Sequence, residues 1–307
     1  MPDVVTVNPA WALPGAALLG LLAVAAASVD GALTARRIGV AAVSGMATPF
    51  VEVARLMRQR RRWTVGTDRM LWRVGSSGLL IAGLLMVAVV PVGPWVLVDS
   101  PVGVVWLNAM DVAVWACVWL AGWGPNAVYP LIGGYRFLAQ ALSYELPLMV
   151  ALITPAVAAG SLRIADVTHA QQGMWFAVWM PVAFGIYCLG VVAFSVWGPF
   201  GSAAGTDIAG GVLAEASGSD RLLLLAGRYV LLAAGATVAV PLFLGGGAGP
   251  LFPAWMWVSI KALVLLVVLV ALRRRLPAVR PDRFLEAGWL VLLPAALLQL
   301  LIVAAVR

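Results

Sequence analysis

Residues 104–123, VVWLNAMDVAVWACVWLAGW, decide the fold class, because this long apolar run contains a single charged side chain, Asp111. A helix needs about 20 such residues, rising about 1.5 Å each, to cross the roughly 30 Å hydrocarbon core of a bilayer. Comparable runs lie at 11–30, 74–95, 138–160, 173–196, 222–245, 253–272 and 286–305. Lipid offers the backbone no hydrogen bonds, so we predict that these eight runs are helices of an all-α, polytopic membrane protein with a single membrane domain over residues 1–307.

The composition agrees with a lipid environment and limits the chemistry of the chain. Hydrophobic residues make up 63% of the sequence and charged residues 11%, whereas soluble domains are nearer half and a quarter. Cys117 and Cys188 lie in apolar runs, which excludes a disulfide framework and an iron–sulfur cluster held by four thiolates within this chain. The lone histidine, His169, is interpreted as structural, and the glycines at 245–247 lack the Lys-Ser/Thr of a phosphate loop. We therefore expect no catalytic residue, no metal site and no cofactor bound in this chain.

The net charge of +7 indicates orientation in the membrane, because most of the basic residues lie in the loops between the runs. One set of alternate loops contains only Arg163 and Arg307, and Lys261 lies within a run. The other set and its flanks contain Arg36, Arg37, Arg55, Arg58, Arg60, Arg61, Arg62, Arg69, Arg73, Arg136, Arg221, Arg228, Arg273, Arg274, Arg275, Arg280 and Arg283. Positive residues favour the cytoplasm, so both termini are predicted on the outer face of a bacterial inner membrane. No nucleic-acid-binding motif accompanies the charge, so no nucleic-acid partner is expected.

A segment near residues 45–60 differs from the eight runs. Pro49 is suited to a first helical turn, and apolar residues then share one face: Phe50, Val53, Ala54 and Met57. The polar residues lie elsewhere on the cylinder: Glu52, Arg55, Arg58, Gln59 and Arg62. The pattern predicts an amphipathic helix at the cytoplasmic surface. The alternative is a solvated basic loop attracted to anionic lipid.

Three ionisable residues lie deep within the predicted spans: Asp111, Glu145 and Lys261. Each is about 10–12 Å from the start of its run, where a charge costs about 2.5–3.5 kcal/mol on insertion scales. A carboxyl group at this depth suits proton exchange through a hydrated passage. The alternative is a static ion pair, for example Lys261 with either acid. Arg228 lies nearer the end of its run and has the reach to snorkel.

Two stretches carry a resemblance to a known family. The first is AGWGPNAVYPLIGGYRFLAQALSYELPL, residues 121–148, and the second runs from 242 to 294 and includes Lys261. Both resemble the quinone-chamber membrane component, known as the H subunit, of bacterial respiratory complex I, the NADH-quinone oxidoreductase. The residues of the first stretch that match the family pattern are Trp123, Asn126, Tyr129, Gly133, Arg136, Ala139, Gln140, Ser143, Tyr144 and Glu145.

The resemblance implies a non-redox subunit that anchors the peripheral redox arm, forms the quinone chamber and couples quinone reduction to proton translocation. Its partners would be iron–sulfur subunits of the peripheral arm, antiporter-like membrane subunits and membrane lipid, with quinone as a substrate at the interface. The implied quinone-cavity residues are Arg36, Arg37, Glu52 and Arg55. The implied proton pathway consists of Glu145, Asp111, Lys261, Glu215 and Asp207, and the implied interface with the peripheral arm consists of Arg136, Tyr129, Arg280 and Asp282.

Several departures from the family pattern mark the chain as a divergent paralogue. The acidic ETNRxPFDLPEAE loop is replaced within residues 194–220, and the family's AEY becomes GRY, which puts Arg228 beside Tyr229. The family's third-span acid would fall near Val114, one helical turn from Asp111, and Asp30 is a stand-in for a first-loop acid. An arginine beside a remaining acid favours a fixed ion pair over a proton relay. The sequence therefore leaves open whether the complex pumps protons. Two other functions stay open, namely the membrane anchor of a hydrogenase or formate hydrogenlyase and a stand-alone carrier.

Overall fold

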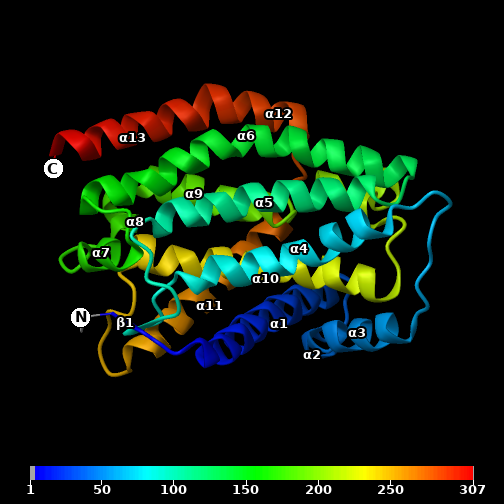
Figure 1. Ribbon diagram of the computed structural model, residues 1–307, viewed down its shortest axis with the longest axis horizontal. Helices are drawn as coiled ribbons and strands as arrows, with labels where there is room; N and C mark the ends of the chain where they lie inside the picture. Colours follow the sequence, from blue (N-terminus) through cyan, green and yellow to red (C-terminus); the bar gives the residue numbers. More distant parts are fainter. Residues whose placement is uncertain (1–3, 307) are drawn as a thin grey trace.

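The computed structural model describes residues 4–306, apart from the Arg274 side chain, and is mainly helical, with its long helices lying roughly along one common axis (Figure 1). Seven helices of the described part are long and apolar enough to cross a membrane. They are α1 (Ala12–Arg37), α4 (Arg69–Ala88), α5 (Gly103–Trp123), α6 (Val128–Ala159), α10 (Gly218–Phe243), α11 (Ala254–Arg275) and the segment Pro281–Val306. That last segment joins α12 (Pro281–Ala287), the π-helical turn η5 (Gly288–Leu292) and α13 (Leu293–Val306). The predicted all-α polytopic fold is confirmed.

The predicted run 173–196 is the one that differs most from the observed helices. It forms α8 (Phe176–Trp179) and α9 (Pro181–Phe194), with Met180 between them. Proline has no N–H to donate back to the preceding turn, so the chain breaks before Pro181 and starts a new helix there. The remaining helix has 14 residues and a length of about 21 Å, shorter than the hydrocarbon core.

The predicted run 74–95 also ends early, because α4 stops at Ala88. A turn containing Pro91, Pro94 and Gly93, whose φ of 68° suits glycine, leads into the short strand β2 (Trp95–Val96). This strand pairs in parallel with β1 (Val5–Thr6), which precedes the short helix η1 (Pro9–Trp11). The pairing ties the N-terminal segment to one end of the helical bundle.

The two ends of the bundle have different secondary structure. Both termini lie at one end, together with α7 (Ile164–His169), whereas α2 (Ala42–Met46) and α3 (Thr48–Arg58) lie at the other (Figure 1). The α9–α10 connection contains three short 3-10 turns, η2 (Ser202–Ala204), η3 (Thr206–Ile208) and η4 (Gly211–Leu213). Several apolar side chains of α3 are exposed, including Phe50, Val51 and Met57. Residues 45–60 therefore contain a helix whose apolar face has no cover within the described chain.

Helix α10 forms the centre of the bundle, and its residues from Val230 to Phe243 are all buried. It packs against α4, α1, α9 and α11, and α4 in turn packs against α5. Small residues allow these close approaches: Gly227 lies against Leu79 of α4, and Gly75 of α4 lies against the α5 backbone at Ala121. The segment α12–α13 packs along α6 at the periphery and is the least buried of the seven helices.

Candidate functional site

Two carboxyl groups meet in the middle of the bundle. Asp111 of α5 is 2% exposed and Glu145 of α6 is 8% exposed, and their side chains are within hydrogen-bonding reach of each other. The Tyr144 hydroxyl donates to Asp111 Oδ1 over 3.3 Å, and the Asn108 side chain contacts the Glu145 carboxyl group. The structure thus brings together two of the acids predicted from separate runs, and it surrounds them with neutral polar groups.

The turn of α6 next to Glu145 lacks one backbone hydrogen bond and packs closely against the α12–α13 segment. Pro147 lies inside α6 and cannot donate to the Ser143 carbonyl one turn earlier. Gly288 packs against the Ser143 backbone so closely that a Cβ would collide with it, and Trp289 Nε1 donates to the Leu142 carbonyl over 3.1 Å. The α12–α13 segment therefore packs against the turn of α6 that carries Glu145.

Each member of the acid pair has an oxygen that lacks a donor. Asp111 Oδ2 and Glu145 Oε2 are buried and have no hydrogen-bond partner. Two ionised carboxylates in contact inside a low-dielectric interior repel one another, whereas a single shared proton gives both oxygens a partner. The geometry can therefore hold and exchange one proton.

A small cavity lies beside the Asp111 carboxyl group. Its volume of about 20 Å³ is close to what one water molecule occupies. The lining comes from α4, α5, α6, α9 and α10 and includes Leu148, Tyr187, Phe194 and Gly235. The Tyr187 hydroxyl donates a hydrogen bond to the Gly235 carbonyl over 2.8 Å, so its proton is not available to a water molecule in the cavity. The cavity therefore has room for about one water molecule beside Asp111.

A second charged group lies between α1, α10 and α11, and we name it the Arg228 cluster: Asp30, Trp197, Arg228, Tyr229 and Arg273. Arg273 Nη1 lies 3.0 Å from Asp30 Oδ2, and the Tyr229 hydroxyl is 3.4 Å from the same oxygen. Arg228 donates to the Val196 carbonyl, and both guanidinium groups lie over the Trp197 ring, at 5.8 Å and 4.5 Å from its centroid. Asp30 of α1 thus has a phenolic partner on α10 and a basic partner on α11.

Lys261 forms an ion pair with neither Asp111 nor Glu145. Its ammonium group donates to the carbonyls of Leu244, Gly246 and Ala248 at 2.7, 2.9 and 2.9 Å, and lies 4.4 Å from the Trp175 ring centroid. An ammonium group has three donors, and all three are used here. The ion pair with Asp111 or Glu145 that the sequence left open is therefore not formed, because Lys261 satisfies carbonyls beyond the end of α10.

The predicted quinone-cavity residues share the α2/α3 end of the bundle. Arg36 and Arg37 occupy the last turn of α1, and α3 packs against α1. Arg55 donates from Nε to Glu52 Oε2 over 2.7 Å, and this hydrogen bond lowers the pKa of the Glu52 carboxyl group. Glu52 and Arg55 therefore pair with one another across one turn of α3.

The remaining predicted residues are mostly surface groups. Arg136 donates to Asp207 over 2.6 Å, and this bond lowers the pKa of the exposed Asp207 carboxyl group. Arg280 and Asp282 form an exposed pair at 3.0 Å, and Tyr129 is exposed in the first turn of α6. Asp207 and Arg136 therefore belong to one contact, although the sequence assigned them different roles.

The connection before α10 contains an acid that sequence reasoning missed. Glu215, which was proposed from the sequence, is half-buried between η4 and α10. Asp220, in the first turn of α10, is 3% exposed, has an oxygen without a partner, and lies 3.7 Å from Arg61. Ser219 also accepts a hydrogen bond from Arg61. The signal in the sequence was the acid directly preceding a long apolar run, beside an arginine-rich loop.

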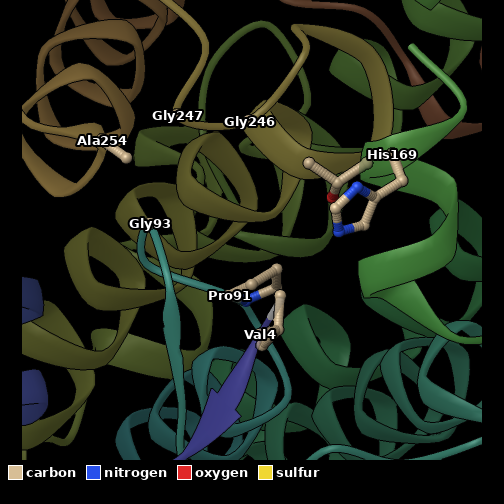
Figure 2. Close-up of a pocket in the computed structure, with 8 residues that line it drawn as sticks. Val4, Pro91, Gly93, His169, Gly246, Gly247 and Ala254 are labelled. Atoms are coloured by element: carbon tan, nitrogen blue, oxygen red, sulfur yellow. The ribbon is translucent and has the colours of Figure 1, made fainter. Parts of the chain in front are cut away.

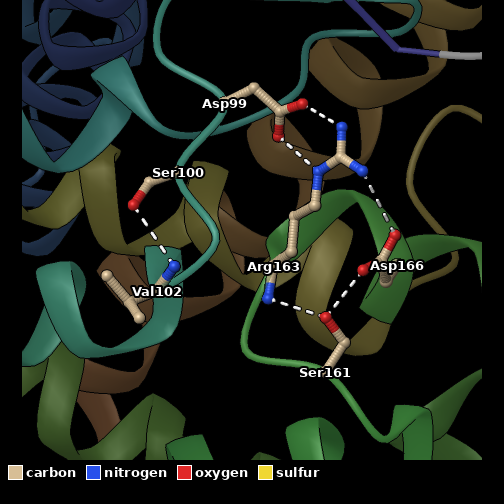
Figure 3. A network of polar contacts seen from close by, with 6 residues as sticks. All are labelled: Asp99, Ser100, Val102, Ser161, Arg163 and Asp166. Carbon is tan, nitrogen blue, oxygen red and sulfur yellow. Dashed lines mark hydrogen bonds and ion pairs between the residues drawn. The ribbon is translucent and has the colours of Figure 1, made fainter.

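The opposite end of the bundle is held by a separate polar network. Arg163 bonds to Asp99 with Nε at 2.8 Å from Oδ1, and Ser161 donates to Asp166 over 2.6 Å (Figure 3). The hydrogen bonds from Arg163 lower the pKa of the Asp99 carboxyl group. The network joins the β2–α5 connection to the α6–α7 turn. Arg307, assigned to this side by its sequence, lies outside the described residues.

His169 lies at this same end. Figure 2 shows its imidazole beside a cavity of about 10 Å³ where α7 meets Val4, Pro91 and Gly246. The cavity is at the limit of what a single water requires. A lone histidine packed among three chain segments favours the structural interpretation.

Comparison with known proteins agrees with the resemblance. A family model described as NADH dehydrogenase matches residues 13–304. NADH-quinone oxidoreductase H subunit 2 of Geobacter sulfurreducens is 33% identical over 270 residues, which cover 84% of this chain and 82% of the relative. The protein of the same name from Syntrophobacter fumaroxidans is 32% identical over 273 residues (85% and 82%), and that from Cereibacter sphaeroides is 36% identical over 228 residues (73% and 71%).

The family model covers both stretches that carried the resemblance, and the prediction of the family is confirmed. Seven apolar helices and membership of the family also establish a multi-pass membrane protein. The chain belongs to the NADH dehydrogenase family, in which its relatives are named as H subunits of NADH-quinone oxidoreductase.

Proposed function

We propose that this chain acts as the H subunit of a complex I-like NADH-quinone oxidoreductase, where it anchors the peripheral arm, forms the quinone chamber and couples quinone reduction to proton translocation. The names of the relatives support this assignment and do not favour a hydrogenase anchor. The observation that carries the coupling role is the contact between Asp111 and Glu145, two buried carboxyl groups that each retain an oxygen without a donor.

The α2/α3 end is our proposed site of quinone binding. A lipid-soluble quinone needs an apolar opening at membrane depth and polar donors for its carbonyl oxygens. The exposed apolar face of α3 supports the first requirement, and Arg36, Arg37 and the Glu52–Arg55 pair support the second. In this proposal quinone is a substrate held at the interface, and the chain itself contributes no redox centre.

The same end is our proposed attachment site for iron–sulfur subunits of the peripheral arm. Tyr129, Arg136, Arg280 and Asp282 are candidates for the contact, because the structure leaves them at or near the surface. Antiporter-like membrane subunits and lipid would cover the apolar sides of the helices. Positive-inside orientation then puts both termini on the outer face of the inner membrane.

For the proton route we propose the Asp111–Glu145 pair as the exchanging group, with Glu215 and Asp207 on the α2/α3 side. Lys261 is placed outside this route, since its three donors are already bound to carbonyls. A carboxyl group that shares a proton can release it when a charge changes nearby, which is the property that coupling requires.

Two experiments test the proposal. Deletion of the chain should leave the peripheral arm unattached to the membrane, and unchanged attachment would reject the anchoring role. In the assembled complex, reconstituted in liposomes, Glu145→Gln should abolish proton translocation while the complex stays intact on size exclusion. The matched control is Glu286→Gln, because Glu286 is an exposed acid paired with Arg283 at 3.3 Å. Wild-type translocation in Glu145→Gln would reject the relay role.

A further inference from the structure

Arg228 lies on the same face of α10 as the cavity beside Asp111. Seven residues separate Arg228 from Gly235, which corresponds to about 10 Å along the helix and a rotation only about 20° short of two full turns. Gly235 and Phe194 line that cavity, and Trp197, three residues after Phe194, lies under the Arg228 guanidinium group. Because α10 starts at the α2/α3 end, Arg228 follows the cavity directly in that direction.

The surroundings of Arg228 carry an excess of positive charge. The charged side chains near enough to act on it, among the described residues, are Asp30, Arg221 and Arg273. Asp30 is already 3.0 Å from Arg273, and Arg221 donates to the Leu213 carbonyl. Among the described side chains and carbonyls, the partners of Arg228 are neutral, namely the Val196 carbonyl and the Trp197 ring, and its buried Nε has none. Within the described part of the chain, this group therefore contains one carboxyl group and three guanidinium groups.

We propose that Arg228 is a fixed positive barrier that closes the α10 face of the Asp111 cavity to protons from the α2/α3 end. Positively charged side chains and helix ends exclude protons from water-filled pores by the same electrostatic mechanism. The Val196 carbonyl and the Trp197 ring hold the guanidinium group in place, so the barrier does not depend on a mobile counter-ion. Protons from the side of Glu215 and Asp207 then reach the Asp111–Glu145 pair by a route that avoids this face of α10. This inference rests on the proton relay proposed above.

The test is passive proton flux through the intact complex in liposomes, with no electron donor present. A potassium diffusion potential set by valinomycin drives the protons, and an internal pH dye reports them. Arg228→Gln should raise the flux about tenfold, as expected for removing one unit charge about 10 Å from a passing proton at an effective dielectric constant of about 20. Arg228→Lys keeps the charge and should leave the flux within about twofold of wild type, since a twofold change is below about 0.5 kcal/mol.

Two further variants decide whether the leak follows the inferred route. The double variant Arg228→Gln/Asp111→Asn should return to wild-type flux, because the route ends at Asp111. Arg283→Gln is the matched control, since it removes an exposed arginine and should change nothing. If Arg228→Gln does not assemble, Arg228→Met removes the charge with a side chain that tolerates burial, and the same flux is expected.

If the assembled complex with Arg228→Gln or Arg228→Met has the wild-type proton flux, the proposed barrier is rejected. It is also rejected if the double variant Arg228→Gln/Asp111→Asn still leaks protons. The result is separable from a failure of the relay itself. If Glu145→Gln abolishes translocation but neutral variants of Arg228 do not leak, the barrier alone is rejected. If Glu145→Gln translocates normally, the relay is rejected, and the barrier with it.

Discussion

At the scale of single residues, burial decides what each charged group of this protein can do. Asp111 and Glu145 contact neutral donors and each other, so a proton is the only charge available to balance them in the described structure. Asp30 and Arg273 form an ion pair that joins α1 to α11. Two types of acid site therefore exist in one membrane domain, one suited to proton exchange and the other to holding helices together.

The prediction at this scale concerns the contribution of Lys261 to the stability of the fold. Its ammonium group serves three carbonyls that follow the end of α10, so Lys261→Met leaves buried acceptors without donors. Each lost buried partner costs about 1–3 kcal/mol, and we expect a loss of at least about 2 kcal/mol in unfolding free energy. The control is Ser259→Ala on the same helix, whose hydroxyl is exposed and bonds within its own turn. Equal thermal unfolding midpoints for the two variants in detergent would contradict this role.

At the scale of elements, the Asp99–Arg163 contact joins the β2–α5 connection to the α6–α7 turn (Figure 3). The hydrogen bonds from Arg163 lower the pKa of Asp99 in the folded state. The stabilisation is therefore fully present above the ordinary carboxyl pKa of about 3.9 and is lost as the pH falls through the lowered value.

Asp99→Asn should lower the unfolding free energy by about 1 kcal/mol or less, since Arg163 is partly exposed and solvent screens the pair. The difference between wild type and variant should be constant from about pH 8 to pH 5 and shrink below about pH 4. Asp282→Asn, in a fully exposed pair, should show no difference at any pH. A difference that grows as the pH falls would contradict the assignment.

The elements also show how far the sequence determines the fold. Apolar runs of about 20 residues predicted the long helices, because length and lipid solubility alone require them. The breaks were harder to predict: Pro181 starts a new helix, yet Pro147 and Pro155 lie inside α6 without ending it. The difference arises from tertiary packing, which compensates a lost hydrogen bond in one helix and not in another. Composition does not encode that compensation.

At the scale of the whole molecule, the pairing of charges across helices could not be read from the sequence. Asp111 and Glu145 were each predicted as costly residues, but their contact depends on the relative rotation of α5 and α6. By sequence Lys261 was equally suited to either acid, and only the fold shows that the glycine-rich loop supplies its carbonyls. Asp220 was missed because its burial depends on the loop containing Arg61, which is distant in sequence.

The topology gives a prediction at this scale. Val65, in the α3–α4 connection, and Leu251, in the α10–α11 connection, are 97% and 96% exposed. In a Cys117→Ser/Cys188→Ser background, Leu251→Cys should react with a membrane-impermeant maleimide added to spheroplasts, because we propose that its connection faces outward. Val65→Cys should react only in inverted vesicles. Labelling of Val65→Cys in spheroplasts would contradict the proposed orientation.

The most direct test of the central claim is the infrared difference spectrum of the assembled complex between oxidised and reduced quinone. If the Asp111–Glu145 pair holds a proton that moves when quinone is reduced, the spectrum contains a protonated-carboxyl C=O band. That band should disappear in both Asp111→Asn and Glu145→Gln, because neither variant retains the pair. A band that persists in both variants would show that the exchanging proton lies elsewhere and would contradict the account.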